Sequence, residues 1–162
     1  MGKRRQAREL ALQALYFLEE QNGDPDQALD LFCGNFSPPR KSRTFFLDLV
    51  KGVQRHQSTI DGIVEGYSDN WKVFRMPRVD RNVIRMAVFE MLWIDDIPPK
   101  VSINEAIDIG KRFGADDSGA FINGILDRIH RALENGEIEN PAKMANGDVA
   151  PSATPGEPYL NG

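Results

Sequence analysis

The sequence predicts an all-α protein, built as a single domain of six to seven helices with a C-terminal tail. Apolar residues recur at three- and four-residue spacing along most of residues 3–140, and no stretch shows the sustained alternation of a half-buried strand. Segments rich in turn-forming residues, such as NGDPD at 22–26 and DDIPPK at 95–100, separate these helical patterns. A chain of 162 residues with 41% hydrophobic content is long enough to bury one core.

The first expected helix begins near residue 3 and ends before NGDPD. Its apolar positions follow one helical stripe: Ala7, Leu10, Ala11, Ala14, Leu15 and Leu18. A second, short helix is expected over about 25–35, because Asp24 is a good N-cap and Pro25 suits the first helical position. SPPR at 37–40 ends that helix.

Residues 41–67 predict the longest amphipathic helix. Its apolar positions are Phe45, Phe46, Leu49, Val50, Val53, Ile60, Ile63, Val64 and Tyr67. After a loop that contains Trp71 and Pro77, the segment VDRNVIRMAVFEMLW at 79–93 is apolar on nearly every face. A helix with this pattern is expected at the centre of a bundle.

Two further helices are expected before the tail. Ser102 and Glu105 have the spacing of a capping box, and Asp116, Asp117 and Ser118 are candidate caps for the last helix. The apolar face of that last helix comprises Phe121, Ile122, Ile125, Leu126, Ile129 and Leu133. Beyond residue 140 the apolar periodicity ends and four of the ten prolines occur, so we expect a helical domain at 1–140 and a disordered acidic tail at 141–162.

The composition excludes several classes of function. No apolar run approaches the roughly 20 residues that span a bilayer, so we expect no membrane protein. One cysteine and two histidines leave almost no ligands for a metal, and we expect no cofactor and a reducing, cytoplasmic setting. No phosphate-binding, dinucleotide-binding or nucleophile motif is present, and His56 and His130 are expected on solvated parts of helices. The sequence therefore gives no support for an enzyme.

The formal net charge of −4 is carried by the end of the chain. Five acidic residues and one basic residue lie from residue 133 onwards, so residues 1–132 are neutral as a whole. A local positive surface on the folded part is therefore compatible with an acidic protein.

Such a surface is expected at the start of the first helix. On a helical wheel Arg4, Arg5, Arg8, Leu12 and Tyr16 fall within an arc of roughly 120° beside the apolar stripe. Acidic residues interrupt the apolar run that a signal peptide would need. Guanidinium groups bind phosphates and a phenol ring stacks on an unpaired base, which suits single-stranded RNA. From these residues alone, RNA binding and an ordinary solvated helix end are equally supported.

Two other groups of residues have a structural and a functional interpretation. Lys111 and Arg112 end one helix before GADDSG, and Phe121 follows; this turn suits an anion, although helix capping and core packing explain it more simply. Arg85, in the apolar central segment, needs a partner if it is buried, and Asp80 and Glu90 are available within the same helix. A structural ion pair is the first interpretation and exposure to a protein partner is the second.

Three segments together resemble the NusB family of bacterial transcription antitermination factors. They are RRQARELALQALY, VDRNVIRMAVFEM and KVSINEAIDIGKRFGADDSGAFINGILDRI, in that order, and the resemblance covers about residues 3–133. It implies two packed three-helix bundles. It also implies binding of boxA-type single-stranded RNA together with NusE, a small-subunit ribosomal protein, and association with other Nus factors and elongating RNA polymerase, notably on ribosomal RNA operons.

The resemblance also implies roles for individual residues. The RNA-binding residues would be Arg4, Arg5, Arg8, Tyr16, Lys111, Arg112, Asp117 and Phe121. Asp80 and Arg85 of the central helix would contribute to the partner-binding side. Family members occur as monomers and as homodimers, and the sequence leaves both open.

Two alternatives remain at the level of the sequence. Related helical modules are fused to cytosine methyltransferases of ribosomal RNA, but such a fusion would require a Rossmann-like domain with a Gly-rich turn. A protein-only interaction module that self-associates is the other alternative, in which the arginines would be charges at the rim of an interface.

Overall fold

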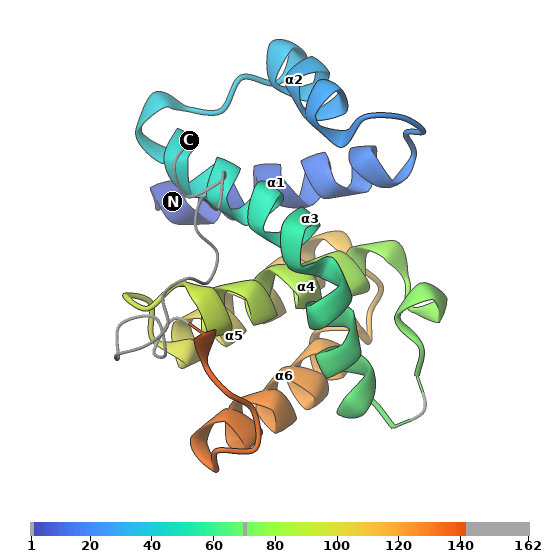
Figure 1. Cartoon of the computed structure of the whole chain (residues 1–162), viewed down its shortest axis with the longest axis vertical. Coiled ribbons are helices and arrows are strands. Elements are labelled where there is room, and N and C mark those ends of the chain that lie inside the picture. The colour runs from blue at the N-terminus through green and yellow to red at the C-terminus, as the bar shows by residue number, and fades with distance from the viewer. Residues whose placement is uncertain (1, 70, 142–162) are drawn as a thin grey trace.

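A computed structural model describes residues 2–69 and 71–141 of the chain (Figure 1). Within these residues the chain forms six α-helices, two short 3₁₀-helices and no strand, so the all-α prediction is confirmed. The α-helices are α1 (Lys3–Glu19), α2 (Pro25–Asn35), α3 (Arg43–Gly66), α4 (Arg78–Trp93), α5 (Pro99–Phe113) and α6 (Ser118–Glu134). The 3₁₀-helices are η1 (Arg40–Ser42) and η2 (Val73–Arg75). The disorder predicted for residues 141–162 falls, except for residue 141 itself, outside the described residues.

The helices form two packed three-helix bundles, as expected. Helix α1 packs against α2 and α3, while α4, α5 and α6 pack against one another. Figure 1 shows α2 at the top, α4 to α6 in the lower half, and α3 running from one bundle to the other. Contacts of α4 with α3 and with α1 join the two bundles into a single core.

Helix α4 lies at the centre, as its apolar sequence predicts. Every residue from Asn82 to Leu92 is buried. Helix α3 approaches α4 closely because Gly52 has no side chain: a Cβ at that position would lie 2.2 Å from Cζ of Phe89. Helix α3 is kinked at His56, whose ring is half-buried and stacks on Trp93 with centroids 4.2 Å apart. The histidine is therefore less solvated than the sequence suggested.

The predicted start of helix α2 is correct, and the predicted start of helix α5 is not. The Asp24 carboxylate accepts a hydrogen bond from the Asp26 N–H at 3.1 Å, which confirms the predicted N-cap. The capping box predicted at Ser102 is wrong, because α5 begins at Pro99. Proline fixes the backbone for the first helical position, so the helix starts a turn earlier. Ser102 instead lies inside the core.

Two groups of ion pairs, one buried and one partly buried, connect α1 to the second bundle. Near its start, the Arg8 guanidinium donates to the Glu90 carboxylate of α4 at 2.7 and 2.8 Å. At its end, the Glu19 carboxylate accepts from Arg81 at 2.9 and 3.0 Å and from Arg85 at 3.0 Å. Among the described helices none has both the length and the apolar character needed to cross a membrane.

Candidate nucleic-acid interface

The first turn of α1 presents Arg4 to solvent. Half of its side chain is exposed, and Nη2 donates to Oδ2 of Asp96 at 3.2 Å, in the segment between α4 and α5. The guanidinium carbon also lies 4.9 Å from the centre of the Phe45 ring of α3. An exposed pair of this kind is weak, so Arg4 is available to an incoming anion.

Arg5 is held more firmly. It forms a bidentate pair with Glu105 of α5, through Nε and through Nη2 at 2.8 Å, and Nη2 also donates to Asp108 at 2.9 Å. These bonds and the charge of Arg5 keep the pKa of Glu105 below its ordinary value of 4.5, against the opposing effect of burial. The same contacts raise the pKa of Arg5, so this cation persists throughout the physiological range.

Arg8 corrects one prediction. The sequence places it on an exposed strip with Arg4 and Arg5, but the residue is only 4% exposed. Its guanidinium pairs with buried Glu90, which also accepts a hydrogen bond from the Ser102 hydroxyl at 2.7 Å. A buried charge requires a partner of this kind, so Arg8 connects the two bundles. The helical wheel could not reveal this, because Glu90 is 82 residues away in the chain.

Tyr16 remains on the surface, whereas Leu12 of the predicted strip is buried. Tyr16 is 40% exposed, and the Arg78 guanidinium carbon lies 5.1 Å from the centre of its ring. Arg78 in turn pairs with Glu20. An exposed phenol ring flanked by a cation can stack on an unpaired base. The strip therefore consists of Arg4, Arg5 and Tyr16.

The second predicted group lies around the turn between α5 and α6. Lys111 and Arg112 are exposed at the end of α5, and Asp117 is exposed at the start of α6. Arg112 donates to Glu9 of α1 at 2.9 Å, so the fold brings this group beside the first one. Asp117 occupies the cap position of α6 without a capping bond from its side chain, which leaves its carboxylate on the surface.

Phe121 is half-buried on α6. Its ring packs edge-to-face against Trp71, with centroids 5.5 Å apart, and both rings line an open cavity of about 260 Å³ together with Arg128. Trp71 is predicted from the sequence only as part of a loop, and Phe74 carries no prediction, yet both are surface aromatics and Phe74 is 71% exposed. The signal available in the sequence was the pair of aromatic residues in the short segment NWKVFRMP, at 70–77, between two expected helices.

Asp80 and Arg85 do not have the exposure that contact with a partner would require. Asp80 is buried and accepts a hydrogen bond from the Ser118 hydroxyl at 2.7 Å; burial raises its pKa. Arg85 is buried too, and it pairs with Asp61 at 2.8 and 2.9 Å and with Glu19. The structural ion pair expected for Arg85 is thus confirmed, but its partners come from other helices.

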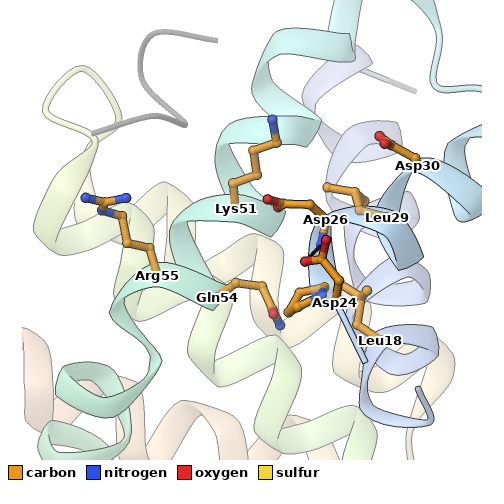
Figure 2. A pocket seen from close by; sticks show the side chains of 9 residues that line it. Leu18, Asp24, Asp26, Leu29, Asp30, Lys51, Gln54 and Arg55 are labelled. Carbon is orange, nitrogen blue, oxygen red and sulfur yellow. Dashed lines mark hydrogen bonds between the residues drawn. The ribbon is translucent and has the colours of Figure 1, made fainter. Parts of the chain in front are cut away.

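A different cavity, of about 520 Å³, lies between α2 and α3 (Figure 2). Asp24, Asp26 and Asp30 lie on the side of α2, and Lys51 and Arg55 lie on α3. None of the residues predicted from the sequence to bind RNA lines it. The described part of the chain contains no group of three or more histidine, cysteine or acidic side chains placed to hold a metal ion.

Comparisons with known proteins cover nearly all of the six α-helices. The model of the NusB family matches residues 5–131. The transcription antitermination protein NusB of Desulforapulum autotrophicum is 61% identical over 137 residues, which cover 83% of this chain and 95% of that protein. The protein of the same name from Desulfatibacillum aliphaticivorans is 57% identical over 133 residues, covering 82% and 93%.

Solved structures agree with this similarity. NusB from T. maritima superposes with a TM-score of 0.73 at 36% identity, covering 83% of this chain and 97% of that one. A chain from a complex of the antitermination factors NusB and NusE with double-stranded RNA superposes with a TM-score of 0.73 at 25% identity, covering 82% and 99%. The similarity therefore extends over both bundles.

Proposed function

The chain belongs to the NusB family, and from this premise we propose that it is a transcription antitermination factor that binds boxA-type single-stranded RNA together with a NusE-type ribosomal protein. The complex would join other Nus factors on elongating RNA polymerase, notably on ribosomal RNA operons. The observation that carries the proposal is the family match over residues 5–131, which includes nearly all of both bundles. Because bacterial transcription takes place in the cytoplasm, the proposal also assigns the protein to that compartment.

The proposed RNA-facing residues follow from exposure and chemistry. They are Arg4, Arg5, Tyr16, Lys111, Arg112, Asp117 and Phe121. The arginines and the lysine would contact phosphates, the two rings would stack on unpaired bases, and the Asp117 carboxylate would accept from a base N–H. Arg8 contributes indirectly, since its pair with Glu90 fixes the position of α1 against α4.

The proposed mechanism is one of binding and assembly, without a catalytic step. Each of Arg4, Arg5 and Arg112 already donates to a carboxylate of the chain. A phosphate must compete with those carboxylates, so the free energy gained per contact is small. We therefore propose that the chain alone binds RNA weakly and that the NusE-type partner, by adding contacts of its own, strengthens binding.

Asp80 and Arg85, which the resemblance assigns to the partner-binding side, are buried in the chain alone, so we propose that they contribute to that side from within. Asp80 holds the start of α6 through Ser118, and Arg85 joins α4 to α1 and α3. Because family members occur both as monomers and as homodimers, the oligomeric state of the chain should be measured in the same experiments as partner binding.

A titration of boxA-type RNA with and without the NusE-type protein tests the proposal. Fluorescence polarisation of a labelled oligonucleotide gives the affinity in both cases, and a scrambled oligonucleotide of equal length serves as the control. We expect weak binding by the chain alone and a large gain with the partner. Absence of binding under both conditions would overturn the proposed function.

A further inference from the structure

A cavity of about 500 Å³ opens between the first turn of α1 and the segment that leads into α5. We name it the α1–α5 cavity; its lining includes the cations Arg4 and Arg5, the carboxylates Asp96 and Glu105, and the apolar residues Ile97, Pro98 and Val101. This volume lies within the range of about 300 to 1,000 Å³ that is common for small-ligand sites. The cavity adjoins the proposed RNA-binding residues, and it is also lined by Ile97, Pro98 and Val101, which are not among them.

One wall of the α1–α5 cavity offers hydrogen-bond donors. A guanidinium group carries about five N–H donors, and Arg4 uses Nη2 for Asp96 at 3.2 Å. Arg5 uses Nε and Nη2 for its carboxylate partners, and no residue in the described part of the chain accepts a hydrogen bond from its Nη1. The remaining donors of both arginines are available to a phosphate.

Another part of the lining is apolar. Ile97 is buried, Pro98 precedes α5, and Val101 is 43% exposed in the first turn of that helix. An exposed aliphatic side chain beside two guanidinium groups makes the cavity amphipathic. An inorganic anion would use only the donors, whereas a nucleotide has a charged phosphate and an apolar base or ribose face.

The backbone adds to the positive potential. Gly2 and Pro98, the N-cap residues of α1 and α5, both line the cavity. Neither helix has a side-chain cap or an acidic residue in its first turn. The positive ends of two helix dipoles thus meet at the cavity, where they favour a negative group.

We propose that the α1–α5 cavity receives one unpaired nucleotide of the bound RNA, with its phosphate on Arg4 and Arg5 and its base against Val101 and Pro98. This inference rests on the proposed RNA-binding function and assigns a nucleotide subsite within it. Asp96, whose side chain is 71% exposed, competes with the phosphate for Arg4 and is displaced on binding.

The experiment compares three single-residue variants in the presence of the NusE-type partner, with the labelled boxA-type oligonucleotide as probe. Val101→Asp places a charge on the apolar wall and should weaken RNA binding about tenfold. Asp96→Asn removes the competing carboxylate and should strengthen binding about threefold. Leu31→Asp, at a 57% exposed position of α2 that does not line the cavity, is the matched control and should bind as the wild type does.

Photo-crosslinking of the wild-type complex gives a readout that needs no variant. RNA that carries 4-thiouridine at one position at a time should crosslink to residues 96–101 from a single position. This crosslink, together with weaker binding by Val101→Asp and unchanged binding by Leu31→Asp, supports the subsite.

The outcomes separate the subsite from the general function. If wild-type protein binds RNA but Val101→Asp binds equally well and no crosslink maps to residues 96–101, the subsite is overturned and the proposed function stands. If Val101→Asp loses the protein partner while keeping its RNA affinity, the cavity belongs to a protein contact and the subsite is likewise overturned. If the wild-type protein binds no RNA, both proposals fail.

Discussion

The arginines of the proposed RNA-binding surface are paired with carboxylates of the same chain. Asp96, Glu105 and Glu9 accept hydrogen bonds from Arg4, Arg5 and Arg112, respectively. Such pairs fix the orientation of the guanidinium groups, and they also reduce the positive charge that RNA would meet at the proposed surface. For single residues, we therefore expect the exposed arginines to contact RNA and the buried arginine to stabilise the core.

Replacing Arg5 with Ala should weaken RNA binding and make it less dependent on salt. One phosphate contact fewer lowers the slope of log affinity against log salt by about one. Polarisation titrations at several salt concentrations measure this slope. Arg131→Ala, which removes an exposed arginine paired within α6, is the control. An unchanged slope for Arg5→Ala would show that Arg5 does not contact a phosphate.

Replacing Arg8 with Ala should instead destabilise the fold, by about 3 to 5 kcal/mol, because it leaves the Glu90 carboxylate buried without its cation. Urea unfolding followed by circular dichroism measures the loss. The double variant Arg8→Met with Glu90→Leu should regain most of the stability, since it removes both charges and keeps similar volume. If the double variant is stable but loses RNA affinity, Arg8 has a direct role in binding that its burial argues against.

At the scale of elements, the packing of α3 against α4 depends on one glycine. Gly52 allows the Phe89 ring to lie against the backbone of α3, where a Cβ would be 2.2 Å from Cζ. Gly62, in the same helix, is exposed, and a Cβ added there would meet no neighbouring atom within 4 Å. The two glycines have the same local sequence propensity and opposite structural roles.

Gly52→Ala should therefore destabilise the protein by about 3 kcal/mol, since Phe89 is fully buried and has no room to move. Gly62→Ala should stabilise it by about 0.4 to 1 kcal/mol, because alanine loses less backbone entropy in a helix. Thermal unfolding of both variants checks the pair. Equal effects of the two substitutions would contradict the close approach of α3 and α4.

At the scale of the whole molecule, charges join the two bundles along the length of α1. Arg5 and Arg8 pair with Glu105 and Glu90 of the second bundle near one end, and Glu19 pairs with Arg81 and Arg85 near the other. Burial would raise the pKa of Glu19, but hydrogen bonds and positive charge from Arg81 and Arg85 outweigh it and hold the pKa below 4.5. The attachment of the bundles to each other is therefore sensitive to acid.

The contribution of Glu19 should have a defined pH dependence. A carboxyl whose pKa is lowered by folding stabilises the protein fully above its ordinary value of 4.5, and this stabilisation disappears as the pH falls through the lowered value. The stability difference between wild type and Glu19→Gln should thus be large at neutral pH and shrink below about pH 4.5. Urea unfolding from neutral to acidic pH measures it, with Glu139→Gln, an exposed position, as the control. A difference that grows on acidification would contradict the assigned pairs.

Much of the architecture is predictable because helical periodicity is a local property. The apolar stripe of the first helix, the N-cap at Asp24 and the central position of 79–93 all follow from residues close together in the chain. The capping box at Ser102 is wrong because Pro99 starts α5 one turn earlier, so Ser102 lies within the helix and its hydroxyl donates to Glu90 in the core.

The helices, most of the core, the family resemblance and a group of cations at the start of a neutral domain can all be read from the amino-acid sequence. Which of those cations remain available depends on how the helices pack. Arg4 and Arg8 are one helical turn apart, yet Arg4 is exposed and Arg8 is buried. A buried cation needs an anionic partner, and Glu90 and Glu105, which lie 82 and 100 residues from Arg8 and Arg5 in the chain, reach α1 only through the packing of the second bundle.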